Sequence, residues 1–589
     1  DNPPAVRNIT ARLYNSDGEV RLAQEVLLGI GGMRALAALG IEPLACHMNE
    51  GHSAFCSLER LAQTMERYGV KLDVALEIIP RSTVFTTHTP VAAGHVEFSV
   101  DRVRPYLQPI ADRLGLSVDE VLVWGQPAGS GPEVPLSMFV LGLRMAQYCN
   151  GVSALHGEVA RRMWAHVWPQ RPDSEVPIGH VTNGVHDSTF LAPENTSLFE
   201  RYMGPEWYLS SRKPENVERI DDIYDEELWR SHDRSRARLI RTVREKMVAQ
   251  YGRRNAPAAA MQLAESVLDP DVLTIGFARR FATYKRATLS LQDPDRLVAL
   301  INAAERPVQF IFAGNAHPRD NEGKELIRQL VEFSRREEVR KRFVFLEDYD
   351  MHMARLMVQG CDIWLNTPRR PYEACGTSGM KAALNGVLNV SILDGWWCEG
   401  YRHDRGWSIG GGEDFDDPAY QDQVESEALY NILENDVIPS FYDRNGGGLP
   451  VRWIRMMKAS MRMAMENFCS LRMAGEYRQR FYEPAVANFQ HLTAEGTDRA
   501  RELAARHARY RNLWHGVQIQ PPVRASEEPL RVGETLRVQC EVHLGELTPD
   551  EVEVELFCGL FQSLGKLVRT RTSAMSMEES LGEGRYRYG

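Results

Sequence analysis

The sequence lacks long apolar runs, paired cysteines and an excess of positive charge. No hydrophobic stretch approaches the roughly 18 residues of a membrane span, so membrane insertion is not expected. The formal net charge is -11 at pH 7, which argues against nucleic acid as a partner, because Lys and Arg must neutralise its phosphates. The nine cysteines stand singly, without metal-ligand spacing, and fit a reducing cytoplasm. We therefore expect a cytoplasmic globular protein.

The chain also lacks an initiator methionine and any signal peptide. It begins Asp-Asn-Pro-Pro and ends with the strand-like "GRYRYG", which suggests a fragment. Its 589 residues, 43% hydrophobic and 25% charged, suffice for about three or four domains.

From about residue 271 onward, apolar strand candidates alternate with helical segments. The five candidates are residues 272–280, 308–316, 342–349, 362–370 and 387–395. This alternation predicts an α/β fold with a doubly wound parallel sheet. Ligands bind beyond the carboxyl ends of such strands. Those ends carry Arg279, Arg280, Asn315, His317, Glu347, Arg369 and Glu373.

The two flanks of this region differ from it. Before it, a helix is expected at 19–39, another after a turn at 151–164, and strands within 41–48, 82–90 and 178–186. After it, helices rich in Met and aromatics reach about residue 515, where core packing explains the composition better than a cofactor site. Strict alternation from Leu536 to Leu544, repeated in "EVEVELF", then predicts an antiparallel β-segment. We divide the chain at 1–265, 266–425, 426–515 and 525–589.

The stretch "CGTSGMKAALNG" places two glycines and two hydroxyls at a strand-to-helix turn. Backbone N–H groups there, with Thr377 and Ser378, suit a phosphate. Lys381 follows at what reads as the start of a helix, where the macrodipole favours anions rather than lysine. The amine is either a charge partner for phosphate or a Schiff-base nucleophile, since burial lowers its pKa. An exposed helix lysine is the competing interpretation.

A second motif, "FARRFATYKR", has four cations within eight positions directly after a strand: Arg279, Arg280, Lys285 and Arg286. Arginine forks and a lysine point charge together resemble a phosphate clamp. A solvated surface loop is the alternative.

The loop "HMNEGHS" contains His47, Glu50 and His52, but not at the spacing of a helical zinc site, so we predict no metal. A hydroxyl-rich ligand suits Glu50 and His52 better. His88 in "TTHTP" and Asn183 in "TNGVH" occupy similar loops after strands, where loop capping is an equally good explanation.

Five motifs together closely resemble the α-glucan (glycogen, starch or maltodextrin) phosphorylases of the shorter bacterial and archaeal type. They are "FTTHTPVAAGH", "HVTNGVH", "GFARRFATYKR", "FAGNAHPRDNEGKELI" and the stretch from Trp364 to Tyr401, in consistent order within residues 19–515. The resemblance implies a GT-B architecture, in which two Rossmann-like domains face a cleft. Residues 1–265 would form the glucan-binding domain, residues 266–425 the domain for pyridoxal phosphate and phosphate, and 525–589 a β-rich accessory domain that is incomplete.

The resemblance also implies roles for individual residues. It makes Lys381 the Schiff-base lysine for pyridoxal 5′-phosphate, whose own phosphate exchanges protons with the substrate phosphate. Further catalytic and cofactor contacts would be Arg280, Lys285, Arg279, Thr377, Ser378 and Tyr349. Sugar contacts would be His88, Asn183, Tyr284, Glu373 and the Gly376 backbone, beside Glu50 and His52. This chain departs from the long-form enzymes at Cys375 and Gly379, and it has Asp350 where those enzymes often have an arginine that contacts phosphate.

The implied activity is retaining phosphorolysis of terminal α-1,4-linked glucose, with α-1,4-glucan and inorganic phosphate as partners. Two alternatives stay open: a GT-B synthase that uses a nucleotide sugar, and an inactive glucan-binding scaffold. A homo-oligomer is compatible with the resemblance. The resemblance starts partway into the family's first domain, so we expect that domain to be incomplete and the chain alone to be poorly soluble or to hold its cofactor weakly.

Overall fold

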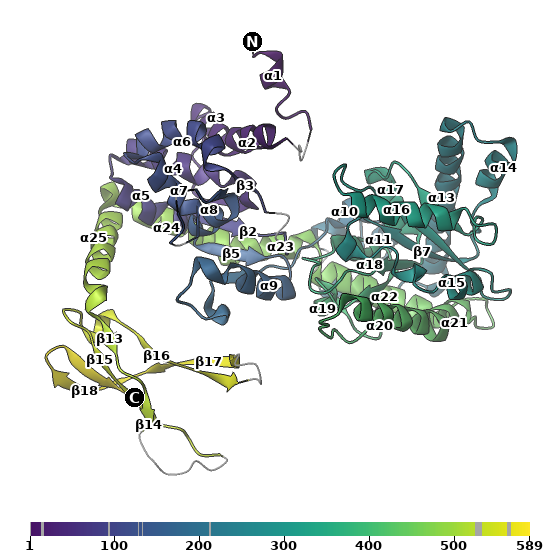
Figure 1. The fold of residues 1–589 in the computed structure, drawn as a ribbon. Helices are drawn as coiled ribbons and strands as arrows, with labels where there is room; N and C mark the ends of the chain where they lie inside the picture. Colours follow the sequence, from purple (N-terminus) through teal and green to yellow (C-terminus); the bar gives the residue numbers. More distant parts are fainter. Residues whose placement is uncertain are drawn as a thin grey trace.

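The chain forms two α/β lobes and a β-rich extension, which Figure 1 shows as separate bodies along the molecule. The computed structural model describes residues 2–12, 17–91, 95–127, 129–131, 133–210, 214–524, 533–561 and 567–589. The first eight residues of the predicted accessory segment 525–589, residues 525–532, lie outside these ranges. We call the part built on the β1-β2-β5-β6 sheet the first lobe, and the part built on the β7–β12 sheet the second lobe.

The first lobe contains a four-stranded parallel sheet in the order β1-β2-β5-β6. Its strands are β1 (Cys46–Asn49), β2 (Thr83–Thr86), β5 (Tyr148–Gly151) and β6 (Ile178–His180). The strands predicted within 41–48, 82–90 and 178–186 are confirmed. β5 was not predicted because its sequence, "YCNG", is short and half polar. A two-stranded antiparallel ribbon, β3 (Glu97–Phe98) with β4 (Leu136–Ser137), lies outside this sheet.

Helices cover the first sheet on both faces. On one face Phe85 packs in a core with Leu58, Leu107 and Phe139, while neighbouring Val84 points to the other face and meets Tyr477 and Phe481. The helix predicted at 19–39 is confirmed as α2, a π-turn (Leu27–Gly31) and α3, and the one at 151–164 as α9. The main helices of this lobe are α2 (Gly18–Val26), α3 (Gly32–Ala38), α4 (Phe55–Tyr68), α5 (Leu72–Ile78), α6 (Val100–Leu114), α7 (Val118–Leu122), α8 (Met138–Arg144) and α9 (Ala154–Trp164).

The second lobe holds a six-stranded parallel sheet in the order β12-β11-β10-β7-β8-β9. The strands are β7 (Leu273–Ala278), β8 (Val308–Ala313), β9 (Phe343–Leu346), β10 (Ile363–Asn366), β11 (Leu388–Ile392) and β12 (Gly406–Ile409). All five predicted strands and the parallel doubly wound sheet are confirmed. Numbered from β7, the order is 3-2-1-4-5-6, so the direction of winding reverses between β7 and β10, where such sheets bind ligands.

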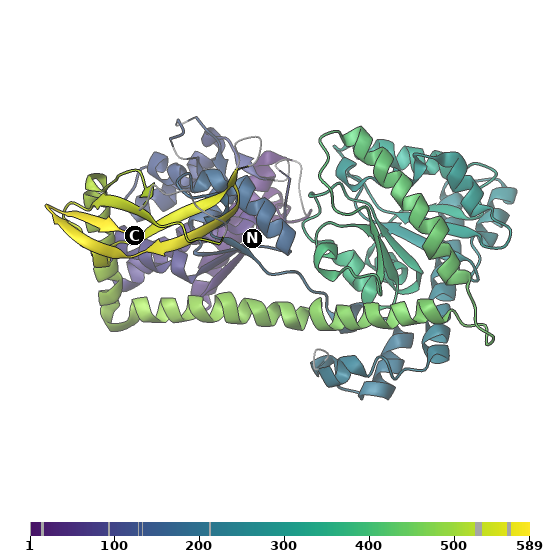
Figure 2. The same cartoon turned by 90° about the horizontal axis from the view of Figure 1, so that it is seen from below.

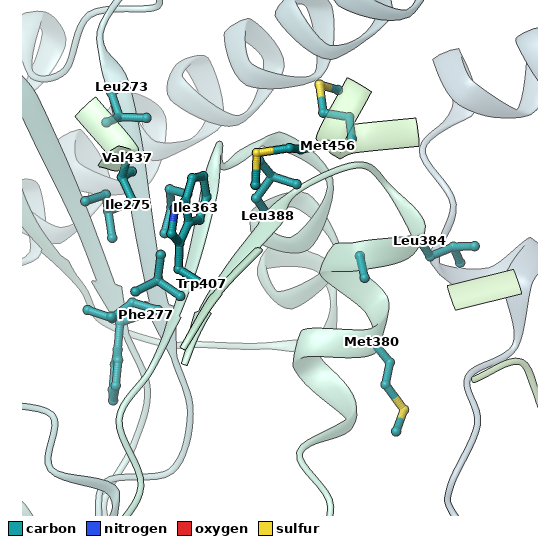
Figure 3. Close-up of a cluster of buried hydrophobic side chains, with 14 of the residues drawn as sticks. Leu273, Ile275, Phe277, Ile363, Met380, Leu384, Leu388, Trp407, Val437 and Met456 are labelled. Atoms are coloured by element: carbon teal, nitrogen blue, oxygen red, sulfur yellow. The ribbon is translucent and has the colours of Figure 1, made fainter. Parts of the chain in front are cut away.

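Both faces of this sheet are buried, which explains why its strands read as continuous apolar runs. Phe310 and Phe312 of β8 face one core, and Ile311 between them faces the other. Figure 3 shows the first of these cores, where Leu388 of the sheet lies beside Met456 of α22, and Ile275, Ile363 and Trp407 belong to the same cluster. The helices concerned are α13 (Asp225–Arg253), α14 (Ala258–Ser266), α15 (Pro294–Ile301), α16 (Asn321–Ser334), α17 (Met351–Gly360), α18 (Thr377–Leu384), α20 (Pro418–Ile432), α21 (Ile438–Tyr442) and α22 (Val451–Asn467).

A buried ionic cluster ties α13 to this sheet. Asp362, 0% exposed, accepts from His232 Nε2 at 2.7 Å, Arg236 at 2.5 Å and the Thr274 N–H at 2.8 Å. Burial alone would raise the pKa of Asp362, but Arg236 and His232 outweigh it and the pKa is lowered. The carboxylate therefore stabilises the fold at neutral pH, and this contribution is lost only as the pH falls below the unfolded value of about 3.9.

We expect Asp362→Ala to destabilise the second lobe by about 3–5 kcal/mol, because it leaves Arg236 buried without its carboxylate. The midpoint of urea unfolding measures this. Glu338→Ala, at an exposed residue, is the control and should shift the midpoint little. Equal midpoints for the two variants would contradict the role given to Asp362.

The chain crosses between the lobes twice, and the crossings run side by side. The Val185 N–H donates to Phe468 O at 2.8 Å, and the Ser470 N–H donates to Val185 O at 2.7 Å. Figure 2 shows α22, α23 (Ser470–Tyr477) and α24 (Glu483–Thr493) following one another from the second lobe back to the first. Residues 187–253 pack on the second sheet although they precede residue 265. The domain division stays a prediction, but hydrophobic packing does not follow its first boundary.

After α25 (Asp498–Leu513) the chain enters the β-rich extension, whose described strand pairs are all antiparallel. Cys540 and Val542 of β15 (Val538–His543) are buried, as is Leu544 directly after it, which confirms the antiparallel pairing and this part of the predicted alternation. Leu536, where the alternation was predicted to begin, is exposed and precedes the strand. The other strands are β13 (Gln518–Ile519), β14 (Val523–Arg524), β16 (Val554–Phe561), β17 (Leu567–Met575), β18 (Met577–Gly582) and β19 (Arg585–Tyr588).

Candidate functional site

Polar residues gather where β7 and β10 end, at the reversal of strand order in the second lobe. Arg279 and Arg280 follow β7, and the loop from Thr367 to Glu373 follows β10. Parallel strands end at one edge of a sheet, so these loops are neighbours: the Arg369 N–H donates to Tyr284 O at 2.6 Å. This is the edge at which the sequence predicted a ligand.

Of the four cations in "FARRFATYKR", Arg286 is structural. Its buried guanidinium donates to the backbone oxygens of Thr367 and Pro368, and it forms ion pairs with Asp422 and Glu425. Arg286 joins the two loops to α20, and its charge is already matched.

Arg279 is also paired, but inside the site. One guanidinium nitrogen donates to Asn366 Oδ1 and the other to Glu373 Oε2. Burial alone would raise the pKa of Glu373, yet Arg279 and then Lys285 outweigh it and the pKa is lowered. Glu373 therefore stays ionised and offers its remaining lone pairs to hydroxyl donors.

Arg280 and Lys285 differ from their neighbours because neither forms a direct ion pair, although the charge of Glu373 acts on Lys285 from a distance. Among the described residues neither cation makes a hydrogen bond or an ion pair from its side chain, and Lys285 Nζ lies 5.4 Å from the Tyr284 ring centroid. Burial, followed by Arg279, lowers the pKa of Lys285 to about 8. Lys285 is half-buried and unpaired, which is costly unless an anion joins it, whereas Arg280 is exposed. The burial of Lys285 between two arginines therefore favours the phosphate clamp over the solvated loop.

The turn before α18 has a conformation that lets a ligand approach its backbone closely. Gly376 has φ 90°, a conformation that favours glycine, and forms the N-cap of α18. Thr377 and Ser378 open the helix, and Trp364 Nε1 donates to Ser378 Oγ at 3.2 Å. A Cβ on Gly379 would lie 2.6 Å from Asn389 Oδ1 and 2.9 Å from the Trp396 ring, which explains why this chain has glycine there.

Lys381 lies in the last turn of α18, because this helix has only eight residues. The expectation that Lys381 opens a helix was therefore wrong, and the macrodipole favours lysine at its observed place. Its amine is 4.3 Å from the Phe190 ring centroid and has no hydrogen bond or ion pair within the described part of the chain. Burial lowers the pKa of the amine. A partly dry, unpaired lysine suits a nucleophile better than a charge partner.

Phe190 was not identified from the sequence, because it is far from Lys381 along the chain. Buried Asn385 joins them, since its Nδ2 donates to Lys381 O at 2.8 Å and to Phe190 O at 2.9 Å. Asp394 was not identified from the sequence either, although it lies within the motif from Trp364 to Tyr401. It accepts from the Glu373 and Gly395 N–H groups at 2.9 and 2.8 Å, and burial raises its pKa to about 8.

Tyr349 lies beside this cluster, after β9, and burial raises its pKa to about 12 while Arg279 acts in the opposite direction. The next residue, Asp350, has a structural role: it caps α17 by accepting from the Met353 N–H at 2.7 Å, and it pairs with Lys246. The departure at Asp350 therefore puts a helix cap where an arginine was expected.

The candidate residues of the first lobe follow β1 and β2. Glu50 has φ 65°, a strained conformation of the kind that clusters at functional sites, and accepts from the His88 N–H. His88 Nε2 lies 3.1 Å from Asn49 Oδ1. His52 is instead held by α2, with Nδ1 2.5 Å from an Arg21 guanidinium nitrogen. No three His, Cys, Asp or Glu side chains of the described residues form a group that could hold a metal ion.

Asn183 connects the first lobe to the Gly376 turn. Its N–H donates to Val152 O at 3.0 Å and its carbonyl accepts from Arg472 at 2.9 Å. Burial raises the pKa of the Cys375 thiol, and the nearby backbone of Asn183 acts in the opposite direction, which places Asn183 beside the residue before Gly376. The structure thus brings Asn183 to the second-lobe cluster.

Comparisons with known proteins agree with this arrangement. A family profile described as carbohydrate phosphorylase matches residues 130–401, and one described as glycogen phosphorylase C-terminal domain matches residues 514–589. Maltodextrin phosphorylase of Thermococcus litoralis is 40% identical over 588 residues, which cover 100% of this chain and 68% of the relative. The chain belongs to the carbohydrate phosphorylase family.

Two further phosphorylases support this membership. Glycogen phosphorylase of Mycobacterium tuberculosis is 40% identical over 599 residues, covering 100% of this chain and 68% of its own length. Glycogen phosphorylase of Aquifex aeolicus is 40% identical over 485 residues, covering 82% of this chain and 68% of its own. The resemblance seen in the five motifs is confirmed. In this phosphorylase, no helix among the described residues has the length and hydrophobicity to cross a membrane.

Proposed function

We propose that this chain is an α-glucan phosphorylase that transfers the terminal α-1,4-linked glucose of a glucan to inorganic phosphate and releases α-D-glucose 1-phosphate with retention. The observation that carries the proposal is the pair of unmatched cations, Arg280 and Lys285, beside the ionised Glu373. Cations and a hydroxyl acceptor at one edge fit a phosphate next to a sugar.

The fold supports a GT-B arrangement for this reaction. Two parallel sheets lie in separate lobes, and the crossings near Val185 and Cys469 join them. Loops after β6 and β10 meet where Asn183 approaches Cys375. A sugar held between these loops would contact both lobes, with Glu50, His88 and Asn183 on one side and Tyr284, Glu373 and Gly376 on the other.

Pyridoxal phosphate fits the second lobe. The Lys381 amine is unpaired and partly dry, which suits covalent attachment, while Thr377, Ser378, Arg279 and Tyr349 border the same edge. When bound, the cofactor supplies through its 5′-phosphate an acid–base partner for the substrate phosphate.

The residues of the chain then position the two substrates and stabilise the transition state. Arg280 and Lys285 hold the phosphate below the glycosidic bond, and Glu373 accepts from sugar hydroxyls. The phosphate gives a proton to the glycosidic oxygen, the bond from that oxygen to C1 breaks, and a phosphate oxygen forms a bond to C1 on the same face. The positive charge that develops on the sugar is offset by the phosphate, so electrostatic positioning provides most of the rate enhancement.

The pH dependence of phosphate binding follows from Lys285. Its ammonium form prevails below its pKa of about 8, so the KM for phosphate should rise as the pH increases above that value. Lys285→Arg stays protonated throughout this range and should lose the alkaline rise. Initial rates over a series of phosphate concentrations, from about pH 7 to pH 9.5, measure both. The same alkaline rise in Lys285→Arg would contradict the role of Lys285.

Two other functions can be distinguished from phosphorolysis by the substrates that they need. A GT-B synthase would need a nucleotide sugar, and an inactive scaffold would bind glucan without turnover. The chain should therefore be incubated with maltoheptaose and phosphate, with and without added pyridoxal phosphate, and in parallel with a nucleotide sugar. We expect glucose 1-phosphate only with phosphate, and more of it with the cofactor. Turnover of the nucleotide sugar alone would refute the proposal.

A further inference from the structure

One carboxylate of the second lobe is bound by the first lobe through both of its oxygens. Glu399 lies in α19 (Trp397–Gly400), near the exposed edge of the second lobe. The Ala154 N–H donates to Glu399 Oε1 at 3.0 Å, and Thr182 Oγ1 donates to Glu399 Oε2 at 2.7 Å. Ala154 begins α9 and Thr182 follows β6, so a single side chain joins two separate loops of the first lobe.

The chemistry of these contacts favours a carboxylate. The first N–H groups of a helix have no partner within it, and the helix dipole favours a negative charge at that end. Ser153, the N-cap, accepts from the His156 N–H at 3.1 Å, and Glu399 accepts from the Ala154 N–H. Hydrogen bonds to an ionised acceptor are stronger than neutral ones.

The two anchored loops are those that touch the sugar side of the candidate site. Thr182 directly precedes Asn183, which reaches Cys375. Ser153 Oγ donates to Ala374 O at 2.6 Å, on the loop between Glu373 and Gly376.

Glu399 is also connected to that loop from its own lobe. The Trp396 N–H donates to Cys375 O at 2.8 Å, and the Glu399 N–H donates to Trp396 O at 3.0 Å. The Glu373–Gly376 turn is therefore held by Trp396 from one side and by Ser153 from the other, with Glu399 joining the two sides.

We propose that Glu399 is a positioning residue, which holds the Asn183 loop against the Glu373–Gly376 turn and so fixes the geometry of the sugar subsite. This inference rests on the proposed phosphorolysis. Glu399 acts through Thr182, Ala154 and the loops they begin, whereas Arg280 and Lys285 are held by β7 and its loop and do not depend on it.

The separation of sugar from phosphate contacts defines the kinetic test. Glu399→Ala should raise the KM for maltoheptaose, and for glucose 1-phosphate in the reverse direction, about ten-fold, while the KM for phosphate changes less than about two-fold. Glu399→Gln should recover much of the loss, since its amide oxygen can accept from Ala154 and its NH2 can donate to Thr182 Oγ1. Glu158→Ala is the matched control, at an exposed glutamate on α9.

Binding of maltoheptaose to the full chain by calorimetry, with thermal unfolding of each variant, completes the test. We expect Glu399→Ala to weaken glucan binding at an unchanged unfolding midpoint. Equal KM values in Glu399→Ala and Glu158→Ala, or a parallel rise in the phosphate KM, would overturn the inference. Calorimetry needs no turnover, so an unmodified chain that binds glucan without releasing glucose 1-phosphate would refute the proposed function separately.

Discussion

Replacing Lys381 with alanine is expected to abolish covalent attachment of pyridoxal phosphate and to reduce phosphorolysis to background. Alanine has no amine to bond the cofactor aldehyde. The structure adds two reasons for this site: the Lys381 amine is unpaired, and burial beside Phe190 lowers its pKa, which raises the fraction of neutral, nucleophilic amine. Borohydride reduction followed by peptide mass spectrometry locates the modified residue.

Two matched variants sharpen this test. Lys381→Arg keeps a positive charge but should also fail to attach the cofactor, which separates attachment from charge. Lys341→Ala, at an exposed lysine, should be labelled like the unmodified chain. A modified peptide that contains another lysine, or a Lys381→Ala variant that is still labelled, would contradict the assignment.

The second large effect is expected at Arg280. Arg280→Ala removes a cation that forms no ion pair with a carboxylate of the described residues. The substitution should therefore weaken the interaction with phosphate and leave the stability of the fold unchanged. Arg280 is exposed, but bound glucan and phosphate would cover it, and a charged contact to the reacting phosphate is then worth about 2–4 kcal/mol, or roughly two to three decades in kcat/KM. Glucan binding should change little, because Arg280 has no role toward sugar hydroxyls.

Initial rates at several phosphate and glucan concentrations, with calorimetric glucan binding, measure this difference. Arg335→Ala, at an exposed arginine that forms the C-cap of α16, is the control. Arg280→Lys should recover part of the rate, since a point charge replaces the guanidinium fork. Unchanged turnover with weakened glucan binding would reverse the role given to Arg280.

The sequence predicted the second sheet well because both of its faces are buried. Strands such as β8, with "VQFIFA", are apolar at every position and stand between clear helical segments. β5 and β12 were missed because "YCNG" and "GWSI" each contain a glycine and only two apolar residues, and neither lies within a longer apolar run. The first-lobe packing of α23 and α24 depends on contacts such as Tyr477 to Asn150, which periodicity does not contain.

The motifs of the candidate site could be predicted from the sequence, but which of its cations form ion pairs could not. "FARRFATYKR" shows four cations, yet only packing distinguishes Arg286, bound to Asp422, from the unmatched Arg280 and Lys285. Glu399 acts across the boundary between lobes, and Phe190 contacts Lys381 from a distant part of the chain, so neither has a local signal. The helix ends were equally hidden: α18 is too short to leave Lys381 at its start.

The most direct test of the central claim is phosphorus NMR of the product. The chain, supplied with pyridoxal phosphate, is mixed with maltoheptaose and inorganic phosphate, and the spectrum is followed with time. We predict that the phosphate signal is replaced by that of α-D-glucose 1-phosphate while the glucan shortens by one glucose for each phosphate consumed. Release of free glucose with the phosphate signal unchanged, or formation of the β-anomer, would contradict retaining phosphorolysis.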